Sequence, residues 1–367
     1  MAGERSRLAR LTPPPAVVDW CLLVTVALSV GTGLYSFTIG GRGGAWVFLI
    51  HAVAGVWLVG LLAWKFRRVA GRLTGRPTRE TAVSIALATT TLAALATGLY
   101  WVHGGLVRVF GGVWTLLTLH AALGLLVVPL LLWHLRYRFR LPRRRDVTDR
   151  RAVLGVGATI AAGAVAWRLQ TALNAALNLA GGNRRFTGSK EDGTDEGNDF
   201  PVTSWVADDP QPVDEAAWSL TVTGLVEREL DLSRAAISPE TEGDGPVPSA
   251  DQRALLDCTS GWYSVHDWSG VRVGDLLDAA EAREDAAWVR FVSVTGYRWS
   301  LPVEEARDAL LATAVDGDPL SHGHGAPARL VAPGRRGFQW VKWVERVEVR
   351  RARDPGQWVA TLVSGFD

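Results

Sequence analysis

The sequence predicts a multi-domain protein in which an N-terminal α-helical membrane bundle precedes a C-terminal α+β domain. Apolar stretches of membrane-spanning length occur in the first half of the 367 residues. Charge divides in the same way, because residues 1–180 hold 20 Lys and Arg against 5 Asp and Glu, whereas residues 181–367 hold 19 against 32. The second half mixes alternating strand patterns with helical ones but lacks regular βαβ units, which indicates an α+β fold.

Five stretches are long enough to cross a bilayer, which takes about 20 residues each. Arginine and lysine concentrate before the first stretch, after the second and after the fourth, whereas the other two loops hold only Arg42 and Arg108. Basic loops tend to remain cytoplasmic, so we expect the N-terminus inside the cell and the C-terminal domain outside. The basic charge of this half therefore indicates membrane topology and no nucleic-acid partner. The five stretches are 16–37, 45–64, 81–101, 113–134 and 152–180.

These boundaries predict four segments. Residues 1–140 form a four-helix membrane domain, and residues 141–180 form a fifth transmembrane helix. The fifth helix begins with Asp149-Arg150-Arg151, which is similar to a twin-arginine export signal and equally suits a plain cytoplasmic anchor. Residues 181–199 are polar and charged and are expected to form a flexible linker. Residues 200–367 form the folded C-terminal domain.

An internal repeat relates the first two membrane helices to the next two. The run Thr32-Gly33-Leu34-Tyr35 recurs as Thr97-Gly98-Leu99-Tyr100, and His51 corresponds to His120. Two copies of one hairpin are expected to pack as a four-helix bundle with an approximate two-fold axis. His51 and His120 then lie at matching depth, where two facing imidazoles would bind the iron of a b-type haem. The alternative is that each histidine only bonds a neighbouring helix.

This bundle resembles the cytochrome b subunits of membrane formate dehydrogenases and hydrogenases. In that group a second haem often uses a histidine at the spacing of His134, but the repeat partner of His134 is Lys65, which is no haem ligand. One haem b or two therefore remains open. His103 is a candidate propionate contact or a loop residue. Gly55 and Gly124, one turn beyond the paired histidines, would leave room for a porphyrin.

Cys258 is the only cysteine outside the membrane half, and it follows a short apolar run that predicts a strand ending in a loop. By itself such a thiol is inert core, a nucleophile or a metal ligand. A second pattern places Arg329 and Lys342 among glycines that permit close approach to a bulky group. A soft thiolate suits a redox metal, and Arg and Lys suit a phosphate. Alone, the two cations would equally suit a solvated strand edge.

The run Cys258-Thr-Ser-Gly-Trp262, followed by Trp268-Ser-Gly and by His324 to Lys342, resembles the sulfite oxidase family of molybdopterin enzymes. The resemblance extends over about residues 200 to 350. It implies that Cys258 is the catalytic thiolate on molybdenum. It also implies that the pterin cofactor is bound by a group of residues in the second run, namely His324, Arg329, Trp340, Val341 and Lys342.

Sulfite-oxidising members of that family carry an arginine soon after the cysteine, and Thr259 to Tyr263 contain none. The pattern is closer to the bacterial methionine sulfoxide reductases of the same family. It favours reduction of an S- or N-oxide, with Trp262, Tyr263 and His266 either near the substrate or packing the interior.

We therefore expect a multi-pass cell-membrane enzyme, a molybdopterin-dependent oxidoreductase. It would exchange electrons between an extracytoplasmic small-molecule substrate and quinone through haem b. One alternative is oxidation of sulfite or another sulfur compound, feeding quinone. Another is a haem b electron carrier or sensor whose outer domain is metal-free. The 2 cysteines exclude a disulfide framework, and the lack of Cys-x-x-Cys argues against zinc, iron–sulfur or c-type haem.

Overall fold

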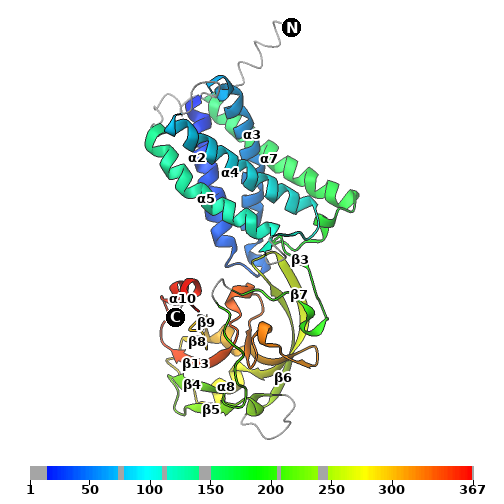
Figure 1. Cartoon of the computed structure of the whole chain (residues 1–367), viewed down its shortest axis with the longest axis vertical. Coiled ribbons are helices and arrows are strands. Elements are labelled where there is room, and N and C mark those ends of the chain that lie inside the picture. The colour runs from blue at the N-terminus through cyan, green and yellow to red at the C-terminus, as the bar shows by residue number, and fades with distance from the viewer. Residues whose placement is uncertain are drawn as a thin grey trace. The chain divides into compact units, whose positions relative to one another are not determined.

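The computed structural model of the chain describes residues 15–72, 78–109, 114–139, 150–204, 208–238 and 247–365. These residues fall into two compact units, Met1–Lys190 and Glu191–Asp367 (Figure 1). The boundary lies inside the predicted linker. Half of the arginines on which the predicted topology depends, such as Arg5, Arg76 and Arg144, lie outside the described residues, as does Asp149 of the twin-arginine-like start.

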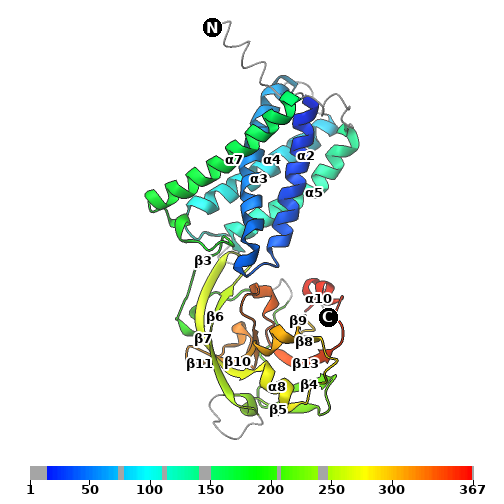
Figure 2. The ribbon, with the colours of Figure 1, turned by 180° about the vertical axis from the view of Figure 1, so that it is seen from behind.

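Unit 1 is built from long helices. Helix α2 packs against α3 and α4 packs against α5, which are the two hairpins expected from the internal repeat, and α7 packs against α3 (Figure 2). Short elements connect them: η1 (Arg42–Gly44), η2 (Ala70–Arg72), η4 (Ala180–Asn183) and the pair β1 (Arg108–Val109) and β2 (Trp114–Thr115). The long helices are α2 (Pro15–Ser36), α3 (Ala45–Val69), α4 (Arg79–His103), α5 (Leu116–Arg138) and α7 (Arg150–Ala176).

Four helices of the described chain are long and apolar enough to span a membrane, namely α2, α3, α4 and α5. Helix α7 is not among them. Alanine and glycine dominate its sequence, and Arg168 and Gln170 interrupt its apolar run. A fifth crossing therefore stays a prediction.

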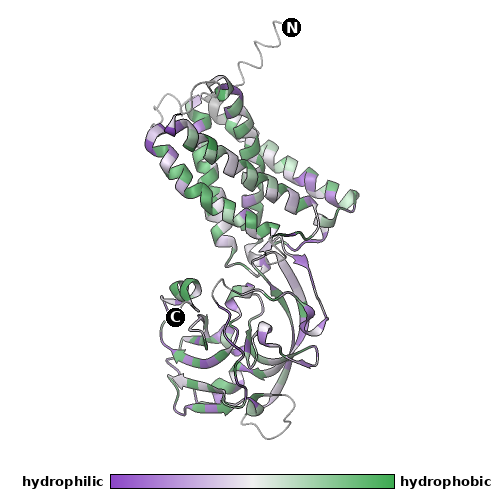
Figure 3. Cartoon of the chain, viewed as in Figure 1, coloured by the Kyte–Doolittle hydropathy of each residue, from purple (hydrophilic) through white to green (hydrophobic). Residues whose placement is uncertain are grey.

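The outward face of unit 1 is apolar. The long helices are predominantly hydrophobic along their length (Figure 3), and Leu132 and Leu154 are 64% and 72% exposed. A continuous surface of this kind is unfavourable in water but favourable in hydrocarbon. With four candidate spans, unit 1 therefore has the properties of a multi-pass membrane domain.

The first part of the predicted linker is fixed to the C-terminal end of α4. Lys190 Nζ donates to the carbonyls of Gly104 and Gly105 over 2.7 and 2.6 Å, and Arg184 donates to the carbonyl of Val102 over 3.0 Å. Carbonyls at a helix C-terminus lack partners within the helix, and basic side chains satisfy them favourably. Further along, the linker contains β3 (Lys190–Glu191) and η5 (Gly197–Asp199).

Unit 2 contains two sheets. In the first, β7 lies between β6 and β10, and β10 also pairs with β11 and β12. The second has the order β5-β4-β13-β8-β9, in which only β13 and β4 run parallel. The first sheet comprises β3, which pairs with β7, together with β6 (Ser249–Asp257), β7 (Trp262–Arg272), β10 (Leu310–Val315), β11 (Asp318–Pro319) and β12 (Arg329–Val331). The second comprises β4 (Ser219–Gly224), β5 (Leu230–Ser233), β8 (Trp288–Ser293), β9 (Arg298–Pro302) and β13 (Val344–Arg350).

Short helices complete unit 2, and the mixture confirms the predicted α+β class. They are α8 (Val273–Ala279), α9 (Val303–Arg307), α10 (Gln357–Val363), η6 (Ala235–Ile237), η7 (His322–His324) and η8 (Gly337–Gln339). The core holds large aromatic side chains, among them Trp268, Trp299 and Trp340.

The sequence pattern predicts helices over residues 271–282 and 303–311, and both are shorter in the structure. Helix 271–282 begins only at Val273 and ends at Ala279, and helix 303–311 ends at Arg307. The second error arises because Leu310 and Leu311 belong to β10, in which every residue is buried. A continuous apolar run of this length does not distinguish a buried strand from a helix.

Candidate functional site

Cys258 lies in the tight loop between β6 and β7. The ladder between these strands ends at the pair Asp257 and Tyr263. The loop is then closed by a hydrogen bond from Cys258 N–H to the Trp262 carbonyl (2.9 Å) and one from Gly261 N–H to the Cys258 carbonyl (3.1 Å). Gly261 has a φ of +100°, which glycine adopts at little cost. The cysteine, 7% exposed, therefore stands where the sequence predicted it, at the end of a buried strand.

A buried ion pair holds this loop. Arg336 Nη1 lies 3.0 Å from Asp257 Oδ1, and the two side chains are only 3% and 2% exposed. The same guanidinium donates through Nη2 to the Cys258 carbonyl over 3.0 Å. Gly337 lies so close that an added Cβ would be 3.2 Å from the Cys258 Cα. Asp257 and Arg336 thus fix the position of the cysteine backbone, a role that the sequence analysis did not assign to them.

Two cations act electrostatically on the thiol. Arg329 on β12 is buried between the rings of Trp268 and Trp340, 5.5 and 5.8 Å from their centroids. Burial lowers the pKa of Arg329 to about 10, and the charge of the Cys258 thiolate opposes this shift. Burial, and next the Arg329 charge, lower the pKa of Lys342 to about 7, again opposed by Cys258. The structure therefore brings Cys258, Arg329 and Lys342 together.

Buried donors in this cluster have capacity for a ligand. Arg329 Nη1 donates to the His324 carbonyl over 2.8 Å, but Arg329 Nε and Trp340 Nε1 are buried with no hydrogen-bond partner in the described part of the chain. Leaving a buried donor unsatisfied costs about 1–3 kcal/mol. Within the described part of the chain, Lys342 Nζ donates to Gly323 O (2.6 Å) and Ser204 Oγ (3.1 Å). Such a donor set fits an anionic ligand that is rich in acceptors, as a pterin phosphate is.

The His324 imidazole and the Val341 carbonyl already have hydrogen-bond partners within the chain. Burial, followed by the Arg329 charge, lowers the pKa of His324 to about 3, so its imidazole is neutral. Nε2 lies 2.9 Å from the Phe200 carbonyl and therefore carries the proton, while Nδ1 accepts from Ser321 Oγ over 2.8 Å. The Val341 carbonyl accepts from Leu330 N–H over 2.8 Å. These two residues shape the site, and neither the His324 imidazole nor the Val341 carbonyl is unpaired.

The predicted substrate residues fall on two faces of β7. Trp262 and His266 lie on its buried face and Tyr263 on the other, as alternation along a strand requires. His266 is fully buried, with Nδ1 2.6 Å from Asp316 Oδ2. The ring of Phe200 packs between His266 and His324, at centroid distances of 4.4 and 3.7 Å. The structure thus brings Trp262 and His266 to the side of β7 that His324 adjoins, but not Tyr263.

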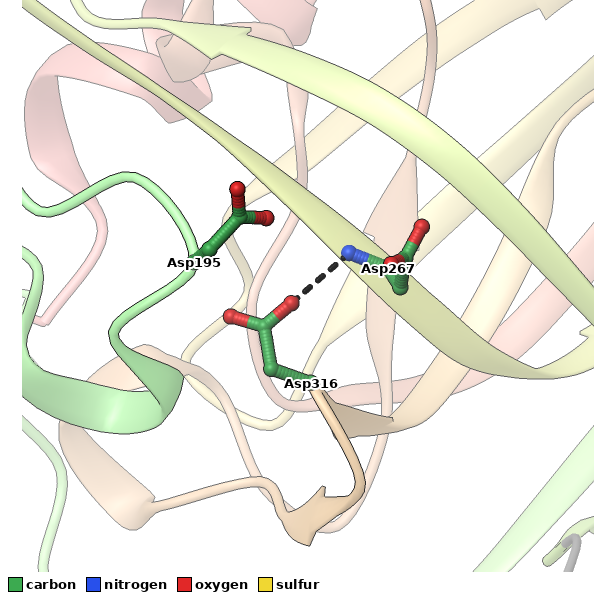
Figure 4. Close-up of side chains that lie close together, drawn as sticks. All are labelled: Asp195, Asp267 and Asp316. Atoms are coloured by element: carbon green, nitrogen blue, oxygen red, sulfur yellow. Dashed lines mark hydrogen bonds between the residues drawn. The ribbon is translucent and has the colours of Figure 1, made fainter.

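Three aspartates gather near His266, namely Asp195, Asp267 and Asp316 (Figure 4). Asp316 Oδ1 accepts from the Asp267 backbone N–H over 2.8 Å. Arg253 donates to Asp195 Oδ1 and to Asp267 Oδ2 over 2.8 and 3.1 Å. Arg253 thus pairs with two of the three carboxylates, and the third, Asp316, serves to orient His266.

A second cluster of buried polar groups lies inside unit 1. The rings of His51 on α3 and His120 on α5 face each other with centroids 6.0 Å apart and planes at 86°. Their Nδ1 atoms lie 3.0 and 2.8 Å from the carbonyls of Ser29 and Ala94. Such bonds set the tautomer and leave each Nε2 available as a ligand. Two imidazoles bound to one ion at about 2 Å each have centroids about 6 Å apart.

The other polar residues of the bundle have separate partners. His134 Nδ1 lies 3.1 Å from Ser84 Oγ. His103 Nδ1 lies 2.6 Å from Asn174 Oδ1. Lys65 pairs with Asp19 at 2.5 Å. Around Gly55 and Gly124 an added Cβ would meet no atom within 4 Å. The described residues thus provide one facing pair of histidines, with space one turn further along each helix.

Comparison with known proteins bears on unit 2. Residues 207–358 match the family described as the oxidoreductase molybdopterin-binding domain. The chain is 30% identical over 162 residues to the uncharacterized oxidoreductase YuiH of Bacillus subtilis. The aligned region covers 43% of this chain and 78% of YuiH. It is 28% identical over 162 residues to the protein-methionine-sulfoxide reductase catalytic subunit MsrP of Gluconobacter oxydans, covering 38% and 49%.

Mitochondrial sulfite oxidase of Rattus norvegicus is 35% identical over 123 residues, covering 30% of this chain and 22% of that protein. The chain thus spans most of YuiH but half or less of the other two relatives.

Proposed function

The chain belongs to the oxidoreductases with a molybdopterin-binding domain. On that premise, we propose that it is a membrane-anchored enzyme that reduces an S- or N-oxide. Its electrons would come from the quinone pool through haem b. The observation that carries the proposal is that Arg329 Nε and Trp340 Nε1 are buried donors without a hydrogen-bond partner among the described residues, in the unit that also buries Cys258. A bound molybdenum cofactor supplies oxygen-atom exchange coupled to a two-electron change.

The residues of unit 2 have distinct parts in this proposal. Cys258 is the protein ligand of molybdenum, and the hydroxyl of Ser260, 3.0 Å from Sγ, donates to the thiolate. Arg329 and Lys342 offset the negative charge of the thiolate and the cofactor, and Arg329 Nε and Trp340 Nε1 supply the donors that the protein leaves unsatisfied. His324 and Val341 form the wall behind them. Trp262 and His266 line the substrate side, while Tyr263 is assigned to packing because it faces the other way.

We propose that His51 and His120 would hold one haem b, which would supply one-electron transfer when bound. The facing rings, the carbonyl-bonded Nδ1 atoms and the open space at Gly55 and Gly124 support this assignment. His134 is left out because its repeat partner is Lys65. Quinone is the proposed partner because haem in a membrane domain can exchange electrons with a lipid-soluble carrier.

The proposed topology has five crossings, with α7 as the fifth. The N-terminus is then cytoplasmic and unit 2 extracytoplasmic, in keeping with the basic residues of the predicted inside loops. Arg150-Arg151 at the start of α7 is the candidate twin-arginine signal. Fusing a reporter enzyme after Asp367, in a strain with and without the twin-arginine pathway, tests both points. A cytoplasmic reporter would mean four crossings.

The contacts of the two arginines near Cys258 favour reduction of an oxide over oxidation of sulfite. Arg336 is committed to Asp257 and to the Cys258 carbonyl, and Arg329 lies between two tryptophans. With Arg336 committed in this way and Arg329 assigned to the cofactor, neither arginine is left for a substrate anion such as sulfite. The similarity to sulfite oxidase favours the second candidate, oxidation of sulfite or another sulfur compound. Reoxidation of dithionite-reduced haem by methionine sulfoxide, set against haem reduction by sulfite, separates the two directions.

Metal and pterin analysis of the wild type and Cys258→Ser tests the proposal as a whole. The wild type is expected to contain molybdenum, pterin and a dithionite-reducible b-type absorbance. Cys258→Ser should lose substrate-dependent electron transfer and keep the haem absorbance. Unchanged electron transfer in Cys258→Ser would favour a haem carrier whose outer domain holds no metal.

A further inference from the structure

Helix α10 presents an apolar face to the outside of unit 2. Trp358, Val359 and Val363 are 45%, 61% and 52% exposed, and Leu362 is 57% exposed. Their spacing places them on one side of the helix, while Gln357 and Ala360 are buried on the other. Among the large apolar residues of unit 2 that the structure describes, only Val202 is exposed to a similar extent.

The interior of the unit fixes the orientation of this helix. The Trp358 ring packs edge-to-face against Trp299, at a centroid distance of 4.9 Å. Gln357 Oε1 accepts from the backbone N–H of Ser300 over 3.2 Å. Asp354 Oδ1 accepts from Gly356 N–H, just before the helix, over 2.9 Å. The apolar face is therefore held outward by specific contacts.

The surroundings of the helix are basic although unit 2 is acidic as a whole. Helix α10 contains no charged residue, and Arg350, Arg351 and Arg353 precede it. The intervening acid, Asp354, is buried and bonded to Arg290 and Arg298 over 3.0 and 2.7 Å. Arg350 is paired with Glu348 and Arg351 with Asp285, whereas the guanidinium of Arg353 stands 5.9 Å over the Trp358 ring. An apolar face with an aromatic edge and flanking arginines combines the features of an interfacial membrane helix.

We propose that the exposed face of α10 docks on the headgroup boundary of a bilayer that contains anionic lipids. A helix of 7 residues is far too short to cross a bilayer, which takes about 20 residues, so it lies in the plane of the interface. Trp358, Val359 and Val363 enter the boundary region, and Arg353 attracts the anionic headgroups. The membrane is the natural occupant because the same chain carries four candidate spans. Docking restricts how unit 2 can turn above the bilayer.

Depth-dependent quenching in the full-length protein tests the proposal. A fluorophore is attached at Val359→Cys, in a Cys21→Ala background, after reconstitution of one chain per lipid nanodisc. Lipids with a spin label near the headgroup act as quenchers. The control carries the probe at Glu229→Cys, an exposed acidic position in the same unit. The protein without an added cysteine measures the background from buried Cys258.

Quenching at position 359 is expected to be several-fold stronger than at 229, and stronger in anionic than in neutral lipid. Val363→Cys repeats the measurement, so that a folding defect in one variant does not decide the outcome. Equal, weak quenching at all three positions overturns the proposal. A probe at 359 that is shielded from water but not quenched by lipid also overturns it, because the face is then covered by protein. If the probe at 359 is shielded from water only in nanodiscs that hold two chains, the α10 face binds a second copy of the chain instead.

Discussion

The two units of this chain distribute polar and apolar side chains in opposite ways. Unit 1 exposes leucines such as Leu132 and Leu154, whereas unit 2 buries its large apolar side chains and exposes few outside α10. The reason is the solvent that each surface suits, since hydrocarbon favours the first and water the second. What the units share is a small set of polar groups withdrawn from either solvent: His51 with His120, and the set around Cys258. Because burying such groups is costly, these are the places where function is expected.

The sharpest test of this comparison removes the proposed haem from unit 1 and leaves the metal content of unit 2 unchanged. His51→Ala or His120→Ala is expected to abolish the b-type absorbance, because the proposed haem loses an axial ligand, while the molybdenum-to-protein ratio stays at the wild-type value. Metal analysis and reduced-minus-oxidised spectra of purified protein measure both. His134→Ala is the control and should keep the band, since His134 bonds Ser84 outside the facing pair. A band that survives loss of either paired histidine would remove the haem assignment.

A smaller effect is expected from the buried ion pair that holds the cysteine loop. Asp257→Leu leaves the Arg336 charge buried without its carboxylate, which should cost about 3–5 kcal/mol of stability. The double variant Asp257→Leu/Arg336→Met should recover much of this loss. Pulse proteolysis in urea, followed on fragments of unit 2, gives the stability. The control is Glu281→Gln in the exposed pair of Arg228 with Glu281, which should change stability by less than about 1 kcal/mol. Equal effects at both pairs would contradict the assigned role.

The internal repeat provides a matched comparison within unit 1. A Cβ at Gly98 would lie 2.9 Å from Cε1 of His120, whereas one at Gly33 would lie 3.4 Å from Cε1 of His51. Gly98→Ala is therefore expected to displace its imidazole, lower haem retention and shift the absorbance maximum. Gly33→Ala should remain near the wild type. Indistinguishable spectra for the two variants would mean that the imidazoles are not held against these glycines.

The smallest expected effect is a pH dependence in unit 2. The folded-state pKa of Lys342 is about 7, below its ordinary value of 10.5, so between these values the unfolded chain binds the proton more readily. The stability of the cofactor-free protein should therefore rise with pH from about 7 towards 10.5. Attraction for a cofactor phosphate should fall over the same rise in pH as Lys342 loses its charge. Pulse proteolysis at several pH values measures how steeply the free energy of unfolding rises with pH, and Lys342→Met should reduce that slope. An unchanged slope would mean that Lys342 is not the group that causes it.

Features that depend on local pattern could be predicted from the sequence. The hairpin repeat follows from two matching runs of residues, and the loop position of Cys258 follows from the apolar run before it. Both are short-range signals, and both agree with the structure. The identity of the residues near the thiol came from family resemblance, because spacing alone does not bring Arg329 and Lys342 to Cys258.

Long-range pairings could not be predicted. Asp257 and Arg336 lie 79 positions apart, and nothing in either neighbourhood indicates that they form a buried ion pair. The same holds for Phe200, whose ring fills the space between His266 and His324. The extent of β7 was missed because it includes Ser264, His266 and Asp267, which interrupt a simple apolar alternation. Such contacts depend on sheet topology, which sequence pattern does not specify.

The attachment of Arg184 and Lys190 to the end of α4 has a mechanical consequence. Helix α7 leads into the segment where the chain leaves unit 1, but that segment is bonded to the end of α4 through Arg184 and Lys190. A force that pulls on this segment is therefore carried by α4 as well as by α7. Burial, with a contribution from Arg184, lowers the pKa of Lys190 to about 8. The bonds that Lys190 donates to Gly104 and Gly105 therefore weaken in moderately alkaline solution, where the lysine loses its charge, and the exit should yield to force more readily there.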